Sequence, residues 1–162
     1  MNWKRAGVGV IETPIIDYLE KLFDDEIEKG NTLRVCVGTD SQRAGKGFKF
    51  ATVILVIAEG NGGMVIGKTY YDKTLVRGKK GVKERMLVEV SKSIETAYEL
   101  SPLLDLYGIP LEIHADINPN PEKGESNKAL AEAVGYILGM GYDFKVKPAA
   151  FAASCSADKL AN

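Results

Sequence analysis

The stretch that decides the fold runs from Leu33 to Asp72 and reads LRVCVGTDSQRAGKGFKFATVILVIAEGNGGMVIGKTYYD. Apolar and other residues alternate at its start, and a nearly continuous apolar run follows from Phe48 to Ala58. Alternation is typical of a strand with one buried face, and a continuous run is typical of a strand buried on both faces. The segment Glu59–Gly63 is a hairpin signal, and a third strand follows over 64–72. These three strands most simply form an antiparallel meander.

Helical patterns lie on both sides of this meander. Thr13 and Pro14 mark the start of a first helix, which Gly30 ends. The remaining elements are expected in the order helix 81–101, strand 111–117, helix 127–140, strand 144–147 and a last helix over 149–160. Strand–helix–strand crossovers give parallel pairs. The sequence therefore predicts an α/β fold, with a five-stranded mixed sheet, helices on both faces and an extra N-terminal helix.

Length and composition indicate one soluble domain. The chain has 162 residues, of which 45% are hydrophobic and 27% charged, and we expect a single domain over 1–162 with a helical extension at 1–30 and a core at 31–162. No apolar run approaches the roughly 20 residues of a membrane helix, and the N-terminus lacks the apolar stretch of a signal peptide. The cysteines Cys36 and Cys155, even with His114, show no metal-ligand spacing, which favours free thiols in a reducing cytoplasm.

Acidic residues stand at positions that the predicted elements would bring together. Asp40 follows the first strand of the meander, and Asp116 lies near the end of the strand over 111–117. Glu84 and Glu89 lie in the early turns of the long helix, and Asp158 lies in the last helix. A single acid at a strand end is usually solvated, but several that converge repel one another unless a cation relieves the repulsion. The placement thus suggests a metal site.

The order of elements and these acids resemble the ribonuclease H-like fold. The stretches VGTDSQ over 37–42 and KPAAFAAS over 147–154 more specifically resemble the YkuK-like, ribonuclease H-related family, and the resemblance covers roughly 30–162. It implies a carboxylate cluster that binds one or two Mg²⁺ or Mn²⁺ ions for phosphodiester hydrolysis. The implied catalytic and metal-binding residues are Asp40, Glu89, Asp116 and Asp158. Glu89 is preferred for the helix position because it borders the apolar stripe of that helix, and Glu84 is the reserve.

A local concentration of basic residues suggests a nucleic-acid partner, although the whole chain is nearly neutral with 21 basic and 22 acidic residues. Lysines and arginines beside a metal site suit a polyanion because they neutralise phosphates. The predicted nucleic-acid contacts are Arg77, Lys79, Lys80, Lys83, Ser41, Gln42 and Asn118. The substrate would be RNA, an RNA–DNA hybrid or structured DNA.

A second hypothesis keeps the same fold without catalysis. Basic runs are most often solvated surface, and a ribonuclease H-like fold can serve as a nucleic-acid or protein-binding module. Such a module would depend on the lysines and not on Asp40 or Asp116. His114 shares strand parity with Asp116, yet a core histidine with a satisfied ring nitrogen is the more common arrangement.

Overall fold

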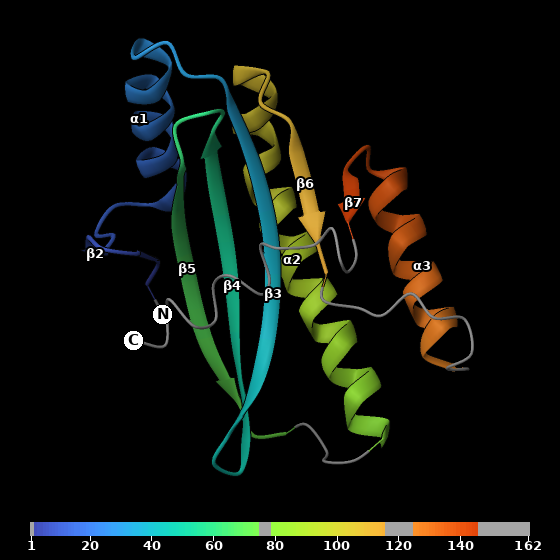
Figure 1. Cartoon of the computed structure of the whole chain (residues 1–162). Helices are drawn as coiled ribbons and strands as arrows, with labels where there is room; N and C mark the ends of the chain where they lie inside the picture. Colours follow the sequence, from blue (N-terminus) through green and yellow to red (C-terminus); the bar gives the residue numbers. More distant parts are fainter. Residues whose placement is uncertain (1, 75–78, 116–124, 146–162) are drawn as a thin grey trace.

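The computed structural model describes residues 2–74, 79–115 and 125–145, with the side chains of some residues in the first turns of α2 and in α3 left aside. Its elements follow one another along the chain as Figure 1 shows. They are β1 (Lys4–Arg5), β2 (Gly9–Val10), α1 (Ile15–Glu28), β3 (Leu33–Ala44), β4 (Gly47–Ala58), β5 (Gly63–Asp72), α2 (Lys79–Tyr107), β6 (Leu111–His114), α3 (Glu125–Gly139) and β7 (Asp143–Lys145).

The strands form one mixed sheet in the order β2-β1-β5-β4-β3-β6-β7. The strands β3, β4 and β5 form the expected antiparallel meander, and β6 and β7 add parallel strands beside β3. The prediction of five strands is wrong, because the described residues form a sheet of seven. The additional strands β1 and β2 have two residues each, which is too short for any apolar periodicity, and β1 gains its backbone bonds by pairing with β5.

Turn residues fix the register of the meander. The turn between β4 and β5 contains Gly60 at φ 78° and Gly62 at φ 88°, backbone conformations that residues with a Cβ rarely adopt. The hairpin predicted at Glu59–Gly63 is thereby confirmed. The registers of β3 with β4 and of β4 with β5 place Val37, Ile54 and Ile66 side by side on one face of the sheet.

All three described helices cover one face of the sheet. A first core cluster joins α1 and the C-terminal half of α2 to β3 and β4, through residues such as Phe23, Val37 and Leu104. A second cluster joins α2 and α3 to β6, through Val90, Ile113 and Ile137. Helices were expected on both faces, and the last of them, expected over 149–160, lies outside the described residues.

Two helix boundaries differ from expectation. The N-cap of α1 is Pro14, with no side-chain capping bond, so Thr13 does not cap the helix. The long helix α2 runs through Pro102 to Tyr107, beyond the range 81–101 predicted from the clean helical pattern, which left a continuation over 103–106 open. Proline inside a helix costs about 3 kcal/mol, and the burial of Leu100, Leu103 and Leu104 around it offsets that cost. None of the helices in the described ranges is long and apolar enough to cross a membrane.

The buried Gly47 offers a test of the packing at the β3–β4 hairpin. A Cβ at Gly47 would lie 2.2 Å from the backbone oxygen of Asp72, and backbone cannot swing away as a flexible side chain does. We expect Gly47→Ala to lower the free energy of unfolding by about 1–3 kcal/mol. Gly135→Ala is the matched control, because a Cβ at this exposed position of α3 would meet nothing within 4 Å. Alanine favours the helix over glycine, so this variant should raise the free energy of unfolding by about 0.5–1 kcal/mol. Urea unfolding measures both, and equal stability of Gly47→Ala and the wild type would contradict the packing.

Candidate metal and nucleic-acid site

The candidate site lies where β3 continues past the end of β6. The parallel pairing of these strands ends at Gly38 opposite His114, whereas β3 runs on to Ala44 beside β4 (Figure 1). Asp40 was expected to follow its strand, and this is wrong: it lies inside β3, paired with Ala51. The polar end of β3 shows no strand periodicity of its own and is held by its twelve-residue pairing with β4. Asp40 thus stands two residues beyond the β6 pairing.

Two hydroxyl contacts join this part of β3 to α2. The Ser41 hydroxyl donates to Oε1 of Glu89, and the Ser93 hydroxyl donates to Oγ1 of Thr39 at 2.9 Å. Two residues along a strand span roughly 6.7 Å and four residues along a helix span about 6 Å, so both contacts form together. Since the strand number rises while the helix number falls, α2 runs antiparallel to β3. The pair of contacts fixes Glu89 beside the polar end of β3.

Burial makes Glu89 a weak acid. Loss of water around the carboxyl and, to a smaller extent, the negative charge of Asp40 raise the pKa of Glu89 from the ordinary 4.5 to about 7. The hydrogen bond from Ser41 and the charge of Arg85 act in the opposite direction without cancelling the effect. Near neutral pH, Glu89 therefore exchanges its proton readily, and a cation at this position would stabilise the ionised form.

Asp40 reaches the site from a different direction. Side chains alternate along β3, so Asp40 points to the face opposite the one on which Ser41 meets Glu89. Its Oδ1 accepts a hydrogen bond from the backbone N–H of Ser41 at 2.9 Å. Because β6 no longer covers this edge of β3, Asp40 is only half buried. Its charge still acts on Glu89, as the pKa of Glu89 shows.

The donor atoms suit a hard divalent cation. Asp40 and Glu89 offer carboxylate oxygens, which Mg²⁺ and Mn²⁺ prefer over nitrogen or sulfur. The ionised form of Glu89, whose pKa is raised, gains stability when a cation binds beside it. The carboxylate oxygens of Asp40 and Glu89 are therefore of the donor type that Mg²⁺ or Mn²⁺, the ions suggested by the sequence pattern, prefer.

The other predicted site residues have different outcomes. Glu84 is exposed on α2, in contrast to the half-buried Glu89, and Gln42 is exposed on β3. The positions Lys79, Lys80 and Lys83 lie in the first turns of α2. The predicted residues outside the described ranges are Asp116, Asp158, Arg77 and Asn118.

Cationic and aromatic side chains flank the polar end of β3. The Arg85 guanidinium lies 4.7 Å from the centre of the Phe48 ring, and the Lys92 ammonium lies 5.0 Å from the centre of the Tyr70 ring. Tyr70 stacks on Phe50 with ring centres 5.0 Å apart. The face of the sheet next to Glu89 therefore carries positive charge held in place by aromatic rings.

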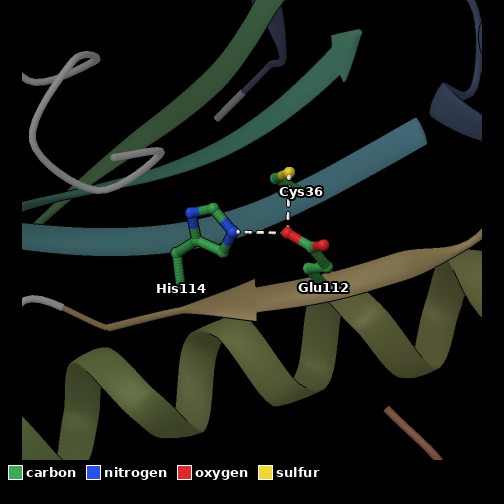
Figure 2. Close-up of side chains that lie close together, drawn as sticks. All are labelled: Cys36, Glu112 and His114. Carbon is green, nitrogen blue, oxygen red and sulfur yellow. Dashed lines mark hydrogen bonds and ion pairs between the residues drawn. The ribbon is translucent and has the colours of Figure 1, made fainter. Parts of the chain in front are cut away.

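A second group of ionisable side chains lies on the face of the sheet away from α2, the face to which Asp40 also points. Figure 2 shows Cys36 of β3 together with Glu112 and His114 of β6, on the side away from α2. His114 Nε2 lies 2.9 Å from Oε2 of Glu112, and the Cys36 thiol donates to the same oxygen at 3.7 Å. Sequence reasoning assigned Cys36 no role and did not single out Glu112. Strand parity was the available signal, since Cys36 and Glu112 are direct partners in the parallel register.

Burial shapes the chemistry of this group. Loss of water and the negative charge of Glu112 raise the pKa of the Cys36 thiol to about 12. Burial also raises the pKa of Glu112, but the hydrogen bond with His114 and the charge of Arg34 outweigh it and lower the pKa below its ordinary value. Arg34 lies 3.4 Å from Oε1 of Glu112, the oxygen that faces away from the group. Glu112 is therefore ionised, and Cys36 carries its proton.

The strand order of the sheet, with helices packed against it, places the protein among the α/β proteins that have a mixed sheet. The chain belongs to the ribonuclease H-like family, because the model of that family, described as "Ribonuclease H-like", matches residues 16–162. The matched stretch begins inside α1 and includes both groups of ionisable residues described above. No curated protein and no solved structure matches the chain.

Proposed function

We propose that this protein is a divalent-metal-dependent nuclease that hydrolyses phosphodiester bonds of RNA, an RNA–DNA hybrid or structured DNA. The observation that carries the proposal is Glu89, a carboxyl whose pKa is raised to about 7 beside Asp40. A carboxylate metal centre requires acidic side chains that can bind the same metal ions. The resemblance of 37–42 and 147–154 to the YkuK-like family supports a placement in that branch.

The ligands of the metal in this proposal are Asp40 and Glu89, joined by Asp116 and Asp158. When bound, Mg²⁺ or Mn²⁺ lowers the pKa of a water molecule and neutralises charge that develops on a phosphate oxygen. Ser41 orients the Glu89 carboxyl through its hydroxyl, and through its backbone N–H it orients Asp40. One residue thus positions both acids.

The basic residues supply phosphate contacts in this proposal. Arg85 and Lys92 lie on the face of α2 toward the sheet, each over an aromatic ring. The positions Lys79, Lys80 and Lys83 precede them on the same helix. Cations arranged along one helix track a phosphate backbone without reading its bases.

The direct test is hydrolysis by the full-length wild-type protein. We expect labelled single-stranded RNA, RNA–DNA hybrid or structured DNA to be cleaved in Mg²⁺ or Mn²⁺, and cleavage to stop in excess chelator. The readout is the length of labelled products on a gel, with circular dichroism to show that the protein is folded. Absence of cleavage on every substrate by folded protein in both metals would overturn the proposal. If such protein still binds nucleic acid without added metal, a non-catalytic binding module is the better description.

A further inference from the structure

We propose that Cys36, Glu112 and His114 form a binding site for one zinc-like transition-metal ion that joins β3 to β6, with ligands other than Asp40 and Glu89. The three side chains project from neighbouring strands to the face of the sheet away from α2 (Figure 2). Each offers one ligand atom, and these atoms all lie within 4.8 Å of one another. The site does not depend on the nuclease activity proposed above.

The distances suit a tetrahedral ion. Zinc bonds of about 2.0–2.3 Å to oxygen, nitrogen and sulfur place neighbouring ligand atoms roughly 3.3–3.6 Å apart. The observed separations from Oε2 of Glu112 are 2.9 Å to Nε2 of His114 and 3.7 Å to Sγ of Cys36. Adjustments of well under an ångström for these two pairs bring the atoms to the required spacing. Three protein ligands leave a fourth position for a water molecule.

The donor types select the kind of ion. A thiolate sulfur and an imidazole nitrogen favour Zn²⁺, Co²⁺ or similar ions, whereas Mg²⁺ demands oxygen. Asp40 and Glu89 present oxygen only, so the two sites differ in the metal that each prefers. Selectivity between soft and hard cations therefore distinguishes this site from the site of the proposed nuclease.

The surroundings hold the ligands in a suitable orientation. Arg34 bonds Oε1 of Glu112, which leaves Oε2 directed at the other two ligands. Outer partners of this kind fix metal-ligand carboxylates. In the parallel register His114 lies opposite Gly38, which has no side chain, so the imidazole has space beside β3. The position that would crowd the site is thus occupied by the smallest residue.

The burial of the group gives the ion a structural role. The Cys36 and His114 side chains are buried, and they belong to strands that are far apart in the chain but adjacent in the sheet. An ion between them adds a link to a β3–β6 pairing of only four residue pairs. Binding to the folded state alone stabilises it in proportion to the logarithm of metal concentration.

The wild-type protein provides the first test. After chelator treatment and dialysis, Co²⁺ is titrated into the full chain under reducing conditions. We expect one equivalent to bind with the near-ultraviolet absorption of a thiolate–cobalt bond, Zn²⁺ to displace it, and excess Mg²⁺ to leave it in place. Zn²⁺ should also raise the melting temperature. Absence of the thiolate absorption in folded protein would mean that the three side chains form only a hydrogen-bonded group, and would overturn the proposal.

Variants identify the ligands. We expect Cys36→Ser to remove the thiolate absorption and His114→Gln to weaken Zn²⁺ binding by at least about 100-fold, since even outer partners of a metal cost 10–100-fold. Cys155→Ser is the matched control for the other cysteine and should keep the full signal. Asp40→Asn should also keep it, which separates this site from the nuclease site. Retention of the absorption in Cys36→Ser, or its loss in Cys155→Ser, would contradict the assignment, and His114→Gln decides the matter if Cys36→Ser does not fold.

Discussion

Replacing Asp40 by Asn is expected to reduce metal-dependent hydrolysis by at least about 100-fold, given that even outer partners of metal ligands contribute 10–100-fold. The amide keeps an oxygen that can accept the bond from the Ser41 N–H, so the local backbone should remain as it is. What is lost is the negative charge, which Mg²⁺ requires. The rate of product formation at saturating Mg²⁺ measures the effect.

The control for this variant is Asp105→Asn, an exposed acid near the end of α2. It changes the net charge by the same amount and should leave the rate within about twofold, because charge far from a site is screened within about 10 Å. A second readout is the pKa of Glu89, which should fall in Asp40→Asn because the charge of Asp40 raises it. An Asp40→Asn protein with the activity of the wild type would remove Asp40 from the metal site.

Glu89→Gln is expected to make the metal-free protein more stable at alkaline pH. In the folded protein Glu89 has a pKa of about 7, against an ordinary value of 4.5. Between these values the folded state binds more protons than the unfolded chain, so the stability of the wild type falls as pH rises. Glutamine removes this dependence and still accepts the Ser41 bond. We expect a gain of about 1–3 kcal/mol at pH near 8 and little change at pH near 4.

Denaturant unfolding in chelator across this pH range measures the gain. The matched control is Glu84→Gln on the same helix. Because the Glu84 side chain is exposed, the stability of this variant should depend on pH as that of the wild type does. Ser41→Ala should steepen the wild-type dependence, because the Ser41 bond lowers the pKa of Glu89. Parallel stability curves for the wild type and Glu89→Gln would show that burial does not disturb this carboxyl.

Periodicity was sufficient for the elements whose own residues drive their formation. The apolar run over 48–58 predicted the central strand, and the helical stripe after Gly81 predicted α2. It failed for Lys4–Arg5 and Gly9–Val10, since two-residue strands exist only through their partners. It also ended β3 too early, because the polar residues after Asp40 are held in the strand by β4.

Local patterns were likewise sufficient for only part of the candidate site. Spacing along the helix favoured Glu89 over Glu84, and the structure finds Glu89 half buried and Glu84 exposed. The contact of Glu89 with Ser41 depends on how α2 docks on β3, which no local pattern encodes. The neighbourhood of Cys36 and His114 likewise follows from the parallel register of two distant strands. Local patterns predicted which residues are candidates, and tertiary packing determines which of them meet.

The two hydroxyl contacts between β3 and α2 bear on the energetics of any reaction at this end of the sheet. Ser93 is 2% exposed and Thr39 is 2% exposed, and Thr39 also bonds Thr52 at 2.9 Å. A slide of α2 by one turn would break both contacts, at about 0.5–1.5 kcal/mol for each lost hydrogen bond, while Ser93 would keep its bond to the Glu89 carbonyl and Thr39 its bond to Thr52. Helix α2 therefore has one preferred position along β3 before any ligand binds. In the proposed nuclease, Glu89 is thus positioned by folding itself, so little reorganisation energy would remain to be supplied when a metal ion and a phosphate bind.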